Sequence, residues 1–295
     1  MYQLLTLIAG VLISLMAVVN GTLTAKVGLY LTTVIIHIVA IIFALVLLGI
    51  RKTPVRIGQK LPIWMYCGGL ISVCCTLCSN FAFGKISLVA ITALGLLAQA
   101  VTSLIIDGLG LLGAQKRKIK PVTWICIAFS FGGIAYMLFG SDMSVFSAVA
   151  ASFAAGVGLV LSRMMSAALG ERAGAVGSSL INHVVGLPFA VLLLFALGGS
   201  ELAPLPGSLG NAPAWAYLGG IAGLMIIVIT NVVLPRVSAF QVSLILFVGQ
   251  VFSGAAIDLL MGAELDARTF VGGVLIAAGV LANTLLEKFT AKNQA

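Results

Sequence analysis

The sequence is organised as a series of long apolar runs separated by short polar segments. Each run is close to the ~20 residues that cross the hydrocarbon core of a bilayer as a helix. Hydrophobic residues make up 61% of the 295 residues and charged residues 8%, so a water-soluble domain could not cover its surface with polar groups. We therefore expect an all-α integral membrane protein with ten transmembrane helices, at residues 4–24, 31–50, 62–83, 87–112, 121–140, 145–168, 176–198, 213–234, 238–261 and 269–288.

The sixteen lysines and arginines are unevenly distributed among the polar segments. If the N-terminus is cytoplasmic, thirteen of them fall on the inner side of the membrane, and only Lys26, Lys85 and Arg268 fall outside. Cytoplasmic loops carry the excess of lysine and arginine in membrane proteins, so we expect both termini to be cytoplasmic. The net charge of +8 then reflects basic loops at 51–60 and 116–120 that face lipid headgroups, and it does not indicate a nucleic-acid partner.

The second half of the sequence repeats the first. A shift of 151 residues aligns Gln99 with Gln250, and a shift of 146 aligns His37 with His183, the only two histidines of the chain. Each half has five runs, an odd number, so the two halves must cross the membrane in opposite orientations. Inverted repeats with a site between them are typical of alternating-access transporters. We expect residues 1–140 to form the first five-helix repeat, 141–146 the linker, and 147–295 the second, inverted repeat.

Several short segments occur in both halves, and together they resemble a known family. The segments are Gly68-Gly69, Asn80 to Ser87 and Leu94 to Asp107 in the first half, with Gly219-Gly220, Asn231 to Ser238 and Gln250 to Asp258 in the second. In these features the chain resembles the YdcZ-type family of the drug/metabolite transporter superfamily, in its fused ten-helix form. The resemblance implies a multi-pass carrier of the bacterial inner membrane, acting as an exporter. It does not imply a particular substrate.

A polar stripe runs along the expected helix at 87–112 and is repeated at 238–261. Polar groups facing lipid are costly, so both stripes should face the bundle interior or a cavity. Gln99 and Gln250 lie nearest to mid-depth, and each amide offers two donors and an acceptor to a polar substrate. The alternative is that the stripes only hold helices together by hydrogen bonds. The stripes consist of Thr92, Gln99, Ser103 and Asp107 in the first copy, and Ser243, Gln250, Gly254 and Asp258 in the second.

Other polar residues inside the runs are candidates for coupling and gating. Asp107 and Asp258 lie near opposite membrane faces and are candidate gating or ion-coupling residues, or helix-end carboxylates that reach water. His37 and His183 lie at mid-helix, where they would bind substrate and relay protons, or each would donate one hydrogen bond to a neighbouring helix. Asn80 and Asn231 are expected toward opposite mouths of the pathway.

Arg163 is the only cation well inside a run. Because it lies toward the cytoplasmic end of the run at 145–168, its side chain could reach the interface by snorkelling, without a function. A role with an anionic substrate is the alternative. The equivalent residue of the first half is Ala17, so any such role would be asymmetric.

The remaining motifs do not indicate an enzyme or a cofactor site. The Cys75-x-x-Cys78 spacing has no second pair to complete a zinc site, so we interpret these cysteines as packing residues. Gly108-x-Gly110-x-x-Gly113 matches a dinucleotide fingerprint but follows no strand. We therefore expect no catalytic residues, metal or cofactor. The expected partners are a small-molecule substrate, the lipid bilayer and a coupling proton or other ion, for a monomer or homodimer. A non-transporting scaffold or accessory subunit is the alternative function.

Overall fold

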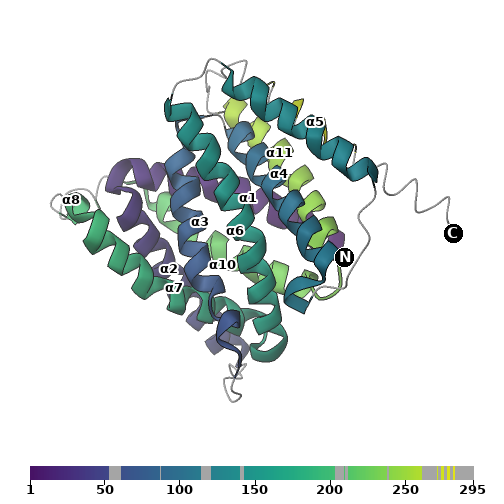
Figure 1. Cartoon of the computed structure of the whole chain (residues 1–295). Coiled ribbons are helices and arrows are strands. Elements are labelled where there is room, and N and C mark those ends of the chain that lie inside the picture. The colour runs from purple at the N-terminus through teal and green to yellow at the C-terminus, as the bar shows by residue number, and fades with distance from the viewer. Residues whose placement is uncertain are drawn as a thin grey trace.

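The structure is a computed structural model, and it describes residues 1–52, 61–86, 88–113, 121–139, 143–202, 209, 212–237, 239–260 and scattered positions between 271 and 282. Within these residues the chain is a bundle of helices without a strand, as Figure 1 shows. The helices are α1 (Tyr2–Val27), α2 (Leu29–Arg51), α3 (Gly68–Ala82), α4 (Leu88–Leu109), α5 (Pro121–Leu138), α6 (Met143–Ala173), α7 (Ala175–Leu197), α8 (Gly199–Leu202), α10 (Gly219–Val233) and α11 (Ala239–Leu260). The short 3₁₀ segments are η1 (Ile63–Met65), η2 (Leu111–Gly113) and η4 (Ala214–Leu218).

The expected membrane protein is confirmed. Among the described residues, six helical segments are long and apolar enough to cross a bilayer: Tyr2–Val27, Leu29–Ile50, Ile63–Ala82, Met143–Ala173, Ala175–Leu197 and Ala214–Val233. The helices α4, α5 and α11 occupy three further predicted runs. Most of the tenth run, 269–288, lies outside the described residues, so the ten crossings and their orientation stay predictions.

The bundle is apolar on its outside and polar within. The outward faces of α2 and α7 carry exposed side chains such as Ile42, Leu45, Leu192 and Phe195, each more than half exposed. Lipid tails are as apolar as these side chains, so this surface is stable only in a membrane. Polar residues are instead enclosed by the bundle, and they include Ser14, Asn20, Thr33, Gln99, Ser103, Asn182 and Gln250.

The helices pack in pairs that follow the sequence repeat. The pair α1–α11 corresponds to α6–α4, and α3–α6 corresponds to α10–α1. Helices α2 and α7 are each other's equivalents in the repeat and pack directly together, as do α4 and α11. Glycines make the equivalent crossings close. A Cβ atom at Gly10 would lie 2.6 Å from the carbonyl oxygen of Leu246, and one at the equivalent Gly156 would meet the Gly95 carbonyl oxygen even more closely. Small residues that bring backbones together in this way are a common basis of helix association in membranes.

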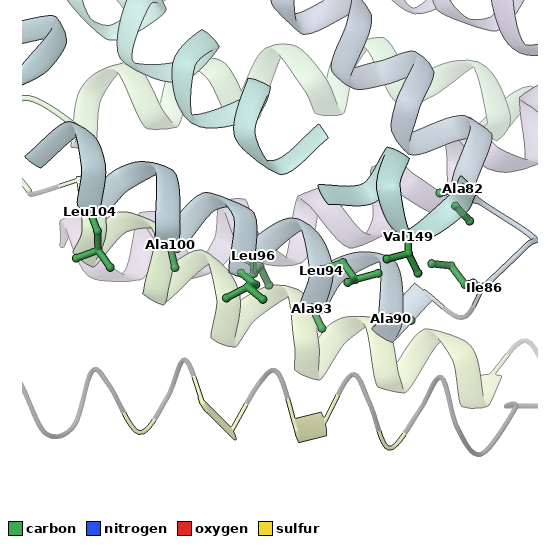
Figure 2. Close-up of a cluster of buried hydrophobic side chains, with 11 residues drawn as sticks. Ala82, Ile86, Ala90, Ala93, Leu94, Leu96, Ala100, Leu104 and Val149 are labelled. Atoms are coloured by element: carbon green, nitrogen blue, oxygen red, sulfur yellow. The ribbon is translucent and has the colours of Figure 1, made fainter. Parts of the chain in front are cut away.

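Helix α4 is held by an apolar cluster on one of its faces. Ala90, Leu94 and Leu97 recur at three- and four-residue intervals and are fully buried. Figure 2 shows the cluster along α4, with Val149 of α6 beside the start of the helix. This packing fixes the rotation of α4 and so directs its polar residues toward the centre of the bundle.

The turns between the first two helices of each half are also alike. Gly28 connects α1 to α2 with φ 97°, and Gly174 connects α6 to α7 with φ 82°, a backbone region that favours glycine. The turn at Gly28 is capped by a residue from the second half of the chain. The Glu201 carboxylate of α8 accepts hydrogen bonds from the backbone N–H groups of Leu29 and Leu31, at 2.9 and 2.8 Å. It thereby satisfies the open N-terminus of α2.

Candidate substrate-binding cavity

A cavity of about 160 Å³ lies at the centre of the bundle. Its wall is formed by side chains of α1, α2, α3, α4, α6, α7, α10 and α11, so both halves of the chain contribute. A single water needs roughly 10–15 Å³ of such space. The cavity therefore has room for a small organic solute.

Six of the predicted substrate-binding residues line this cavity: Gln99, Gln250, His37, His183, Asn80 and Thr92. All six are buried within the bundle, with at most 7% of their surface exposed. They come from α2, α3, α4, α7 and α11, which are far apart in the sequence. The repeat had aligned the two glutamines and the two histidines, and the fold places each pair around one space.

Two other predicted residues lie away from the cavity wall. The side-chain amide of Asn231 donates to the backbone oxygen of Ala175 at 3.1 Å, in the turn between α6 and α7. The hydroxyls of Ser243 and Ser103 are 3.2 Å apart and join α11 to α4. These contacts match the alternative in which polar residues hold helices together. The side chains of Asp107 and Asp258 lie outside the described part of the structure.

Arg163 does not snorkel to the interface. It is buried and lines the cavity, and its guanidinium donates a hydrogen bond of 2.5 Å to the side-chain oxygen of Gln99. The reason is the length of α6, which continues to Ala173, past the expected end at residue 168. Arg163 is therefore ten residues from the last residue of its helix, about 15 Å along the axis. At this depth the side chain extends into the cavity.

The two histidines meet at the interface of the two halves. Their ring centroids are 5.1 Å apart, with the rings nearly perpendicular at 75°. His37 Nδ1 lies 2.8 Å from the carbonyl oxygen of Thr33. A carbonyl accepts only, so Nδ1 carries the hydrogen in this bond and Nε2 of the neutral ring is an acceptor. His37 Nε2 has no hydrogen-bond partner among the described residues.

Several buried polar atoms of the cavity residues have no hydrogen-bond partner in the described protein. They are Asn20 Oδ1, His37 Nε2, Asn80 Nδ2, both ring nitrogens of His183, and Gln250 Nε2. Each such atom costs roughly 1–3 kcal/mol if it stays unpaired. The cavity therefore offers donors and acceptors that a polar solute or water would satisfy.

A polar wall formed by α3 and α6 was missed by the sequence reasoning. Ser72, Thr76 and Ser79 recur at intervals of four and three residues along α3, and Ser162 and Ser166 flank Arg163 on α6. Hydrogen bonds tie this wall together: Ser162 donates to the Gly68 carbonyl oxygen at 2.9 Å, and Asn182 of α7 donates to Ser72 at 3.3 Å. The signal was present in the helical spacing of these hydroxyls within otherwise apolar runs.

Comparison with known proteins decides the family. The family model described as "Putative inner membrane exporter, YdcZ" matches residues 1–136 and again residues 147–286. The chain belongs to this family. The YdcZ family belongs to the drug/metabolite transporters, and its inner-membrane location agrees with the apolar helices of this chain.

A solved protein structure is similar to this YdcZ-family chain over 98% of both chains, with a TM-score of 0.64 and 17% sequence identity. At this identity the likeness concerns the fold alone. No curated protein matches the sequence.

Proposed function

We propose that this protein is a secondary active exporter that moves a small polar metabolite or drug by alternating access. In this proposal the chain crosses the membrane ten times with both termini in the cytoplasm, and the two inverted repeats rock about the central cavity. The observation that carries the proposal is the position of Gln99 and Gln250. These symmetry-related amides reach one cavity from opposite halves of the chain, among buried polar atoms that lack hydrogen-bond partners in the described part of the protein.

Coupling to protons is assigned to the histidine pair. Protonating one ring disfavours protonation of the other at a centroid distance of 5.1 Å, so the pair would take up one proton at a time. If the pair couples transport, the transport rate should depend on pH, and His37→Gln with His183→Gln should flatten that dependence. An unchanged pH profile of efflux from proteoliposomes would remove the pair from the mechanism.

A thermal-shift screen of the purified protein tests substrate binding. The panel contains amines, amino acids, carboxylates, nucleosides and sugars at two pH values. A solute at 100 times its dissociation constant stabilises the folded state by ~2.7 kcal/mol. We expect a shift with one chemical class that is lost in the Gln99→Ala/Gln250→Ala double variant.

The matched control is Thr102→Ala on the same helix α4, because the Thr102 hydroxyl bonds to the Ala98 carbonyl oxygen of its own helix. This variant should keep the ligand-dependent shift. A shift that persists in the glutamine double variant would contradict the proposed binding site. Silence across the panel would favour a scaffold or accessory subunit.

A further inference from the structure

The two walls of the cavity have equivalent helices, but they differ in chemistry at several equivalent positions. On the α3–α6 wall the cavity is lined by Ser72, Thr76 and Arg163. The equivalent positions of the α10–α1 wall, under the shifts of 151 and 146 residues, are Gly223, Ile227 and Ala17. At these three pairs of positions the α3–α6 side is polar and cationic and the α10–α1 side is apolar, while Ser14, Asn20 and Thr230 add polar groups elsewhere on the α10–α1 wall.

The positive charge of Arg163 has a neutral protein partner. Its guanidinium donates to the amide oxygen of Gln99, and no carboxylate pairs with it among the described residues. Burying a charge is expensive unless it is paired and hydrogen bonded. A guanidinium presents five N–H donors in a planar fork, and the bond to Gln99 uses one of them. The remaining donors suit the two oxygens of a carboxylate, which arginine binds in a bidentate manner.

Gln99 also holds the guanidinium in place. The bond between them is 2.5 Å long and joins α4 to α6, and Gln99 itself is 1% exposed. A glutamine oxygen accepts hydrogen bonds without neutralising the charge, so the arginine stays available to an anion. An aspartate or glutamate at this position would satisfy the arginine internally.

We infer that the cavity binds a small amphipathic organic anion, with its carboxylate on Arg163 and its apolar part against the α10–α1 wall. This inference names the substrate class of the proposed exporter and rests on that proposed function. The apolar part would contact Ile13, Met16, Ile226 and Ile227. A cation would be repelled by Arg163, and a sugar-like solute would leave the apolar wall in contact with hydroxyl groups.

Three isosteric probes that differ in charge test this inference. Benzoate, benzamide and benzamidine share one ring and nearly one shape, but they are anionic, neutral and cationic at pH 7.5. Their dissociation constants would be measured by thermal shift and isothermal titration calorimetry on the full-length protein in detergent. We expect benzoate to bind at least ~10-fold more tightly than benzamide, and benzamidine to bind most weakly, as a charge-assisted bidentate contact would produce.

Two substitutions of Arg163 separate the effect of its charge from the effect of its planar shape. Arg163→Gln should abolish the preference for benzoate, and Arg163→Lys should keep part of it, because lysine retains the charge but not the fork. The control is Arg236→Gln, since Arg236 is exposed and bonds to the Val232 carbonyl oxygen of its own helix. That variant should bind benzoate like the wild type. Should Arg163→Gln fail to fold, the ranking of the three probes on the wild type decides alone.

Other outcomes would overturn the inference. Equal binding of the three probes, a preference for benzamidine, or an undiminished benzoate preference in folded Arg163→Gln would each exclude the anion-binding role of Arg163. The absence of any shift with all three probes would exclude it as well. A further such result is probe binding that is lost in the Gln99→Ala/Gln250→Ala variant but unchanged in Arg163→Gln. That result would be compatible with the proposed exporter but would exclude an organic anion as its substrate class.

Discussion

The C-terminal ends of α3 and α10 are equivalent in the repeat, yet the asparagine at each end makes different contacts. At the end of α10, Asn231 donates to the Ala175 carbonyl oxygen in the α6–α7 turn, and Gly170 packs against its side chain. At the end of α3, the equivalent Asn80 lines the cavity, and its amide nitrogen has no hydrogen-bond partner among the described residues. The cavity wall therefore includes Asn80 at the end of α3 but not the equivalent Asn231 at the end of α10.

This difference shows which features are the same in both halves of the repeat and which features differ. Equivalent glycines keep the helix crossings close in both halves, as Gly10 and Gly156 do. Some residues that line the cavity differ between the halves, as Arg163 and Ala17 do, whereas Gln99 and Gln250 are alike. Inverted repeats can exchange their conformations only if both halves share a backbone design, whereas a substrate without two-fold symmetry needs two different walls. In the proposed exporter, the symmetric part would serve the motion and the asymmetric part would serve recognition.

The largest loss of stability is expected where glycines bring two helices into close contact. A Cβ at Gly156 would clash with the backbone of α4, and one at Gly10 with the backbone of α11 at a slightly longer distance. We expect Gly156→Ala to destabilise the protein by ~3 kcal/mol and Gly10→Ala by somewhat less, since overpacking at a backbone contact forces the helices apart. Thermal unfolding in detergent measures both.

The control for the glycine pair is Gly132→Ala in α5, where a Cβ would meet nothing within 4 Å. This variant should be neutral or more stable by up to ~1 kcal/mol, because alanine favours the helix. Equal stability of the Gly156 and Gly132 variants would show that the close crossing does not contribute to the fold.

An intermediate effect is expected for the two glutamines. Gln99 holds the Arg163 guanidinium, whereas the amide nitrogen of Gln250 has no hydrogen-bond partner among the described residues. Gln99→Ala should therefore weaken benzoate binding by ~10-fold, about 1.4 kcal/mol, and Gln250→Ala by less. Calorimetric titration of the two variants checks the order. The reverse order would mean that the glutamine without a partner carries the recognition.

The smallest effect is expected at the two asparagines. Asn231→Ala removes a buried hydrogen bond and leaves the Ala175 carbonyl without its partner, so it should cost about 1 kcal/mol of stability. Asn80→Ala removes an amide whose nitrogen has no hydrogen-bond partner among the described residues, so its melting temperature should stay close to that of the wild type. Melting curves of the two variants without ligand make the comparison. Equal losses of stability would contradict the different contacts of Asn80 and Asn231.

Much of this architecture could be predicted from the sequence because it depends on simple quantities. The length of the apolar runs predicts helices, and the repeat identifies His37 and His183 as equivalent positions. Their ring contact was not predicted and is seen only in the structure. Arg163 could not be placed, because its depth depends on where α6 ends, and helix ends are poorly marked by apolar residues. The repeat also predicted equal roles for Asn80 and Asn231, but a repeat fixes backbone positions and leaves side-chain partners open.

The central claim is that the cavity opens in turn to the two sides of the membrane, and cysteine labelling tests it most directly. Thr76 lies on the cavity wall and is partly accessible, so Thr76→Cys would be introduced into a chain whose five native cysteines are replaced. Right-side-out and inverted membrane vesicles would then be treated with a membrane-impermeant thiol reagent. Ile38→Cys on the lipid-facing side of α2 is the matched control and should stay unlabelled in both. The account predicts labelling of the Thr76→Cys protein from both sides. Labelling from one side only, or from neither, would contradict it.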